Sequence, residues 1–229
     1  MSSPVAAEAG FQPAYVLFRP SQKSGGQAEQ TQLLTSYLGI AARYVAGQPS
    51  GDGATALQEA LGELPGLTTA NVSSNATSNV FEDEDGASVD LVSMAAKEIA
   101  DTLRLGSAFL PALEDLLNQP VTAAFDEVAD TQAKTRSVEA TVVFGLINAA
   151  TDSGPSLNFV QTSFSLDREK TSGVFGSSYQ VAAAVKVTWE GYGIGSLETV
   201  RGFVAEEEKA GLITDLTKAG RLKIYTIED

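Results

Sequence analysis

The spacing of apolar residues changes from a helical period to a strand period about halfway along the chain. Before residue 137, apolar side chains recur mostly every three or four positions, which is typical of amphipathic helices. This spacing predicts helices over 27–46, 54–64, 89–105 and 110–136. Pro120 has no backbone N–H to donate, so the last of these helices should bend or restart there.

From residue 137 the period becomes two, which indicates strands. The alternation is clearest over 178–190, where one face carries Tyr179, Val181, Ala183, Val185, Val187 and Trp189. Two similar strands are predicted over 137–148 and 157–168. The connections are too short for crossover helices, so the three strands should form an antiparallel meander. A helix from Leu197 and a last strand over 222–227 follow.

These elements predict an α+β protein. A mainly antiparallel sheet is expected from the meander over 137–190 and from terminal strands over 14–19 and 222–227, covered by the amphipathic helices. No linker divides the chain, so 1–229 is expected to be a single domain. In it, 1–13 should be a loose tail and the Ser/Thr/Asn-rich segment 68–88 a polar loop.

The composition excludes several classes of chemistry. The 229 residues include no His and no Cys, which rules out Ser-His-Asp triads, disulfides and imidazole or thiolate metal sites. The chain has 15 Lys+Arg against 29 Asp+Glu, a net charge of -14, and no basic run, so no nucleic-acid partner is expected. No signal peptide or long apolar span is recognisable. The expected location is therefore the cytoplasm, with release from the cell left open.

Acidic residues supply the candidate metal site. Asp83 and Asp85 lie in the acidic segment 82–86, and Asp90 follows closely. Ca²⁺ prefers such oxygen ligands, although their spacing is not that of an EF-hand. The alternative is a solvated acidic loop before a helix, and no cofactor is expected. Asp126 and Asp130, four residues apart on one helix, form a possible acid–base pair but are expected to face water.

The glycine-rich turn over 191–196 lies between a strand and a helix, where a phosphate loop would lie. The sixth position is Ser196 instead of Gly, and no Lys-Ser or Lys-Thr pair follows. The turn is therefore expected to be structural, with Ser196 as the N-cap of the following helix.

The helix predicted over 110–136 supplies a candidate interface. Its apolar stripe includes Leu113, Leu117, Val121 and Phe125. If the sheet does not cover this stripe fully, it would associate with another apolar surface, and self-association is the expected partnership. A membrane or another protein is the alternative partner.

Two stretches resemble known families. The segment 113–135, LEDLLNQPVTAAFDEVADTQAKT, resembles the opening of a bacterial family of unknown function, which implies an Ala-rich helix before long antiparallel strands. The order of helices first and then strands over 140–148 and 158–166, joined by the polar loop 148–154, resembles the Cyt-type cytolytic toxins and their fungal relatives. That resemblance implies helical layers over a sheet whose long strands enter membranes. The terminal helix–strand segment 197–227 departs from the pattern, and neither resemblance implies a site residue.

Three functions follow as hypotheses. The first is a non-enzymatic, self-associating protein with a structural or partner-binding role. The second is a membrane-active, pore-forming protein like the Cyt toxins, for which the acidic charge disfavours anionic membranes. The third is a carboxylate-dependent enzyme or a calcium binder that uses Asp83, Asp85, Asp126 or Asp130.

Overall fold

The computed structural model describes residues 14–20, 27–46, 53–82, 87–129, 137–149, 154–173, 176–209 and 222–227. The strands are β1 (Ala14–Pro20), β2 (Leu67–Glu82), β3 (Ser137–Asn148), β4 (Ser156–Gly173), β5 (Gly176–Ile194) and β6 (Leu222–Ile227). The helices are α1 (Ala28–Ala46), α2 (Gly53–Gly62), α3 (Ala87–Thr102), α4 (Leu110–Ala129) and α5 (Leu197–Lys209), with a 3-10 turn over Ser107–Phe109. The α+β class is as predicted. The expected tail 1–13 lies outside the described residues.

One six-stranded sheet has the order β2-β5-β4-β3-β1-β6. The neighbours β3, β4 and β5 are consecutive in the sequence, which confirms the predicted meander. β1 runs parallel to both β3 and β6, with Val16 opposite Leu146 on one side and Lys223 on the other. The two terminal strands therefore extend the sheet beyond β3, with β1 next to β3 and β6 at the edge.

β2 occupies a segment that the sequence indicated as part of a polar loop, 68–88. It forms a strand at one edge of the sheet, next to β5. The side chains that the structure describes from Thr68 to Val80 are mostly exposed, and among those described in β2 only Phe81 is buried. The strand buries almost no apolar side chains, so it lacks the alternation by which strands are recognised. Its β-branched Thr and Val residues nevertheless favour extended backbone.

The structure divides into two compact units. That the chain forms a single domain stays a prediction. Unit 1 comprises 1–6, 74–142 and 162–188, and unit 2 comprises 7–73, 143–161 and 189–229. The boundaries fall within β2, β3, β4 and β5, so each of these long strands contributes to both units.

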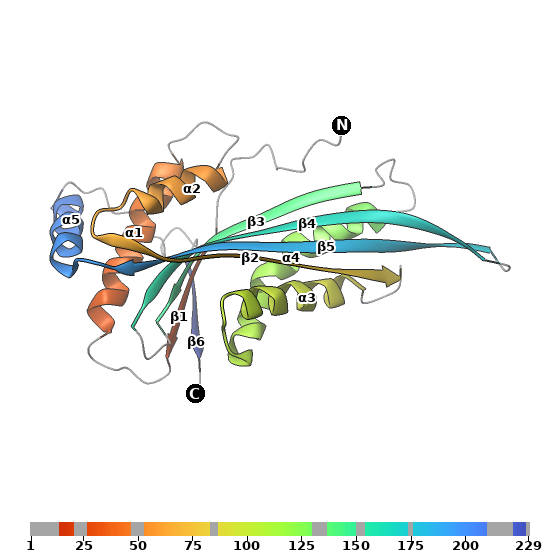
Figure 1. The fold of residues 1–229 in the computed structure, drawn as a ribbon, viewed down its shortest axis with the longest axis horizontal. Coiled ribbons are helices and arrows are strands. Elements are labelled where there is room, and N and C mark those ends of the chain that lie inside the picture. Colours follow the sequence, from red (N-terminus) through yellow and green to blue (C-terminus); the bar gives the residue numbers. More distant parts are fainter. Residues whose placement is uncertain are drawn as a thin grey trace. The chain divides into compact units, whose positions relative to one another are not determined.

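Unit 1 contains α3, α4 and parts of the long strands. The two helices pack against each other beside these strands (Figure 1). The strand side chains that alternate with exposed residues and face the unit's core are Val138, Thr162, Phe164, Leu166, Val181, Ala183, Val185 and Val187. α4 continues through Pro120, so the helix does not restart there.

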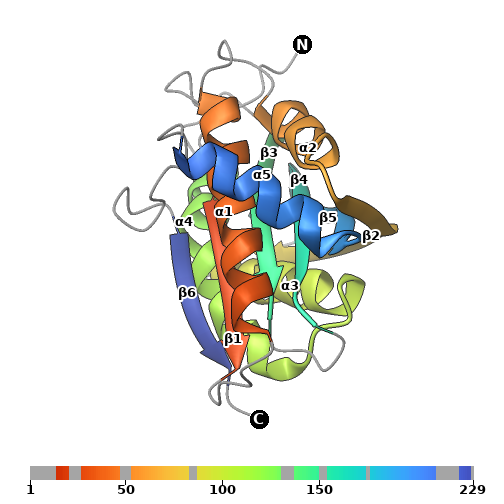
Figure 2. The ribbon, with the colours of Figure 1, turned by 90° about the vertical axis from the view of Figure 1, so that its left-hand side faces the viewer.

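Unit 2 contains α1, α2 and α5 together with β1, β6 and the remaining parts of the long strands. α5 crosses α1 (Figure 2). Tyr37 and Phe203 meet edge to face at this crossing, with ring centroids 5.7 Å apart and an interplanar angle of 87°. The buried core continues through side chains of α2, β3, β4 and β5, among them Leu61, Ile147, Phe159 and Tyr192. Among the described residues, no helix has the length and apolar character needed to cross a membrane.

Candidate functional site

The acidic residues are not brought together in the described part of the chain. Asp83, Asp85 and Asp130 lie outside the described residues, while Asp90 and Asp126 are exposed on α3 and α4. Within the described ranges, no three Asp or Glu side chains are grouped so that they could hold a metal ion. The calcium site stays a prediction from the sequence.

The glycine-rich turn is structural in its packing. The backbone N–H groups of Gly195 and Ser196 both donate to the carbonyl oxygen of Gly66, at 2.9 and 3.1 Å. Ser196 Oγ accepts a hydrogen bond from the N–H of Thr199 at 3.3 Å, which confirms the predicted N-cap of α5. A Cβ on Gly195 would lie 2.6 Å from Thr68 Cγ2, so a glycine is needed where the start of β2 passes this turn.

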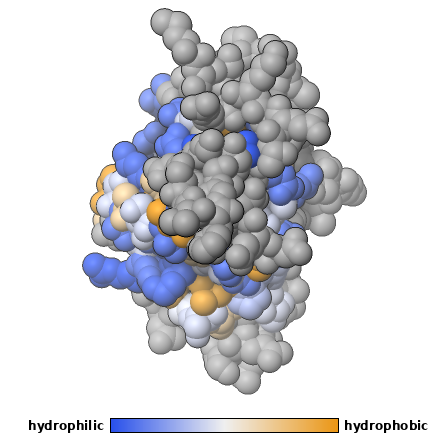
Figure 3. Space-filling model, turned by 90° about the vertical axis from the view of Figure 1, so that its right-hand side faces the viewer, coloured by the Kyte–Doolittle hydropathy of each residue, from blue (hydrophilic) through white to orange (hydrophobic). Residues whose placement is uncertain are grey.

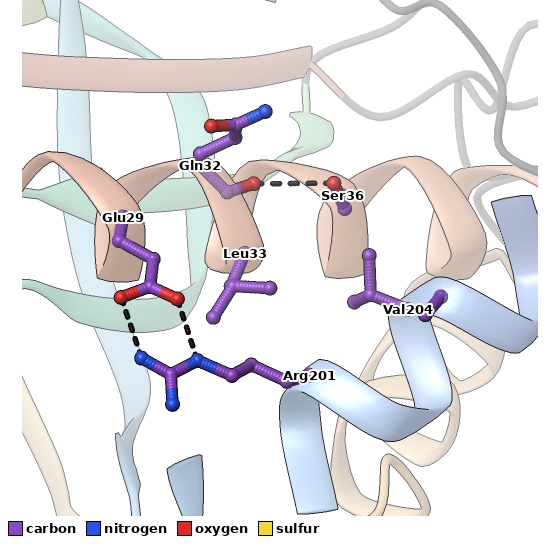
Figure 4. A pocket seen from close by; sticks show the side chains of 7 residues that line it. Glu29, Gln32, Leu33, Ser36, Arg201 and Val204 are labelled. Atoms are coloured by element: carbon purple, nitrogen blue, oxygen red, sulfur yellow. Dashed lines mark hydrogen bonds and ion pairs between the residues drawn. The ribbon is translucent and has the colours of Figure 1, made fainter. Parts of the chain in front are cut away.

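A shallow hollow of about 220 Å³ lies between α1 and α5 in unit 2 (Figure 4). The Arg201 guanidinium holds the Glu29 carboxylate there in a bidentate ion pair. This hydrogen bonding lowers the pKa of Glu29 from its ordinary value. The remaining lining includes Leu33 and Val204. Since the guanidinium already binds an internal carboxylate, the hollow is poorly suited to capturing an anionic ligand.

The strands of unit 1 have two faces of opposite character. On β5, Val181, Ala183, Val185 and Val187 are buried, whereas Ala184 and Lys186 between them are exposed. On the exposed face, the hydroxyl oxygens of Thr141 on β3 and Ser163 on β4 lie 3.5 Å apart. The strands therefore carry one apolar face turned inward and one polar face turned to water.

The helix pair of unit 1 supplies the apolar surface against which the inner strand face packs. Leu113, Leu117, Val121 and Phe125 of α4 are each 5% exposed or less. An interface that uses these four residues, as the sequence suggested, requires α4 to leave its place in the unit. In the view of Figure 3, the visible described residues carry only small, separate hydrophobic spots among hydrophilic ones.

A polar hollow of about 240 Å³ lies between α3 and α4. Ser93 of α3 donates a hydrogen bond to Glu114 of α4 across it, at 2.8 Å. Val89, at the start of α3, is 60% exposed beside it. The hollow is open to solvent, and the polar groups in its wall are hydrogen-bonded to each other. We therefore interpret it as the groove between two packed helices and not as a binding cavity.

Sequence reasoning missed two features. The Glu29–Arg201 pair joins residues far apart in the chain, and no local pattern indicates it. The exposed valines of β2, Val72 at 67% and Val80 at 51%, lie in a segment that looked like a polar loop. The signal that could have found them was the absence of any charge from 67 to 81 in a strongly acidic chain.

No family model matches the chain, and no curated protein matches it. Among solved structures, it is similar to the Evf virulence factor, with 10% identity over 94% of this chain and 86% of the other, at a TM-score of 0.48. It is also similar to a delta-endotoxin, with 13% identity over 83% and 88% of the two chains and a TM-score of 0.41. A third is the activated Cyt2Ba monomer from Bacillus thuringiensis subsp. israelensis, with 13% identity over 78% and 97% and a TM-score of 0.35.

One of these neighbours, Cyt2Ba, is a Cyt toxin, the family that the order of elements in the sequence resembles. The resemblance to the family of unknown function is not confirmed. All three TM-scores are below 0.5, so these likenesses carry no argument about function.

Proposed function

We propose that this chain is a membrane-active, pore-forming protein whose long strands enter lipid once α3 and α4 leave their inner face. The proposal assigns no catalytic residue, in keeping with the expectation from the sequence. The observation that carries it is the alternation on β5, where buried Val181, Ala183 and Val185 alternate with the more exposed Gln180, Ala182 and Ala184. A strand between lipid and water needs this pattern of apolar and polar neighbours.

The strands have the length that the proposal requires. A strand tilted across the hydrocarbon core needs about 9–11 residues. β4 has an uncharged run from Ser156 to Leu166, and β5 has one from Gly176 to Val185. β3 has a third, from Ala140 to Asn148. These runs carry no charge. Residues 143–148 and 156–161 lie in unit 2, so the parts that the departure of α3 and α4 would expose to lipid are 140–142, 162–166 and 176–185.

The packing of α3 and α4 supports the proposal, because these two helices cover the inner face of the strands in unit 1 and could leave it together. α3 and α4 are consecutive in the sequence and pack closely against each other, so they can move as a pair. Their buried residues, such as Leu91, Ile99 and Leu117, would be exposed to lipid at the same time as the inner strand face. Burying this apolar surface in lipid would offset the free energy of separating the helices from the strands of unit 1.

The charge of the chain sets the lipid preference. A net charge of -14 opposes approach to an anionic surface. We therefore expect activity on zwitterionic vesicles and weaker activity on vesicles that contain anionic lipids. Salt should narrow this difference because it screens the repulsion.

Dye release from phosphatidylcholine vesicles tests the proposal. Release is expected to rise with protein concentration and to fall when phosphatidylserine is added. Vesicles of both compositions that stay sealed at every pH and protein concentration would contradict it.

Labelling at adjacent positions of β5 tests the role of the strands directly. The chain has no Cys, so each single-cysteine variant carries one label. A fluorophore on Val185→Cys should be quenched by nitroxide lipids in the membrane, and one on Ala184→Cys by aqueous iodide instead. Ala123→Cys, at an exposed position of α4, is the control for non-specific adsorption. Equal lipid quenching at 184 and 185 would rule out an inserted strand.

A further inference from the structure

The edge strand β2 combines exposure with an absence of charge from Leu67 to Phe81. No Asp, Glu, Lys or Arg occurs from Leu67 to Phe81, although the chain as a whole has 44 charged residues, 15 basic and 29 acidic. No Pro occurs in this run either. Charged side chains and Pro are the usual means by which proteins prevent edge-to-edge pairing, so β2 lacks the normal protection.

The backbone of β2 shows which residues point to the free edge. The N–H of Val80 donates to the side-chain oxygen of its neighbour Asn79, at 2.9 Å, from which we infer that it points away from β5. In an antiparallel pair, alternate residues direct their N–H and C=O groups to the same side. The residues at 72, 74, 76 and 78 therefore present their backbone groups to the free edge together with Val80.

We propose that β2 pairs with β2 of a second copy of this chain, antiparallel and about a two-fold axis at Ala76. This register places Val72 of one copy opposite Val80 of the other, and Ser74 opposite Ser78. All of these residues present their backbone groups to the edge, so the hydrogen-bond pattern and the side-chain pairing agree. Val72 and Val80 are the exposed large apolar residues of β2, and each gains an apolar partner.

Charge favours a second copy over other occupants of this edge. Two copies with a net charge of -14 each repel one another, and the repulsion is smallest where no charged side chain enters the contact. A basic partner would find no acidic residue to pair with between 67 and 81. A two-fold pairing also uses the edge completely, so the assembly stops at a dimer. The inference does not depend on membrane activity.

The mass in solution provides the first test. Sedimentation velocity of the full chain should show conversion from monomer to dimer as protein concentration rises, and more dimer at high salt. Ala76→Lys places two ammonium groups opposite each other at the axis. It should raise the dissociation constant by at least about tenfold.

Ala123→Lys is the matched control, because it makes the same charge change at an exposed position of α4. If general repulsion controlled association, both lysine variants would associate more strongly than the parent chain, since each makes the net charge less negative. We expect this only for Ala123→Lys. Circular dichroism of both variants shows whether the strands are retained.

Cross-linking provides the second test and does not depend on a destabilising charge. Directly opposite residues of a hydrogen-bonded antiparallel pair have Cα atoms about 5.5 Å apart, within the range of a disulfide. A mixture of the Val72→Cys and Val80→Cys chains should form a mixed disulfide much faster than either variant links to itself. A parent chain that stays monomeric at all concentrations overturns the proposal. So do equal dissociation constants for the two lysine variants, or self-linking as fast as mixed linking.

Discussion

The Arg201 guanidinium on α5 makes two hydrogen bonds to the Glu29 carboxylate on α1, from Nε to Oε1 at 2.5 Å and from Nη2 to Oε2 at 2.7 Å (Figure 4). This planar geometry suits Arg and cannot be reproduced by Lys. Both side chains are 52% exposed, so the pair orients the helix crossing more than it stabilises the fold.

Stability should depend on pH through this pair. Arg201 lowers the pKa of Glu29 in the folded chain. The contribution of the pair is therefore present above the ordinary pKa of 4.5 and is lost as the pH falls through the lower, folded value. Arg201→Gln should have a slightly lower urea midpoint than the parent chain at neutral pH, and the difference should disappear in acid. A constant difference at every pH would contradict this explanation.

Tyr37 should contribute to the loss of stability at alkaline pH. Its hydroxyl donates to the carbonyl oxygen of Pro65 at 2.6 Å, and burial raises its pKa to about 12. The unfolded chain releases this proton near pH 10, before the folded chain does, so stability should fall between these two pH values.

The variant that isolates this effect is Tyr37→Phe. At neutral pH it should lose about 0.5–1.5 kcal/mol, because the hydrogen bond to Pro65 is removed. Between pH 10 and 12 its stability should decline less steeply than that of the parent chain. Urea unfolding at a series of pH values measures both effects, and parallel curves would show that another group causes the alkaline loss.

The buried hydroxyl of Thr162 should lower the stability of unit 1. Thr162 is fully buried on β4, and its Oγ1 finds no hydrogen-bond partner among the described residues. Thr162→Val keeps the shape and removes the unpaired hydroxyl, so it should stabilise the chain by about 1 kcal/mol. The urea midpoint should rise with no change in the slope of the transition. Ser163→Ala, on the adjacent outward-facing position, is the control and should not stabilise.

The sequence predicted the elements that bury a face and missed the one that does not. β3 and β5 were recognised because Val138, Val181 and Val185 alternate with polar residues over a buried face. α5 was placed correctly because Ser196 is a local N-cap signal. Among the described side chains of β2 only Phe81 is buried, and the strand takes its place from pairing with β5, a long-range relation that composition does not reveal.

The candidate sites were predictable to a smaller extent. The sequence correctly predicted that apolar side chains share one face of α4. It could not tell whether Leu113 and Leu117 on that face pack against a sheet or against a partner. That depends on whether α3 and the strands together provide enough apolar surface, which is a property of the assembled unit. Likewise, Glu29 and Arg201 lie on helices whose crossing is set by the packing of Tyr37 against Phe203.

Weaker packing of α4 in unit 1 should lower the stability of the chain and at the same time speed its action on membranes. Leu117 is fully buried in α4, and Leu117→Ala should cost about 2–5 kcal/mol by leaving a cavity. If α3 and α4 must leave the strands before these meet lipid, weaker packing of α4 should speed dye release from phosphatidylcholine vesicles. Leu61→Ala is the matched control, since Leu61 is equally buried in α2 of unit 2 and loses the same atoms. Release should be faster for Leu117→Ala than for Leu61→Ala at equal loss of stability. Equal rates would mean that general unfolding, and not departure of the helix pair, limits the encounter with lipid.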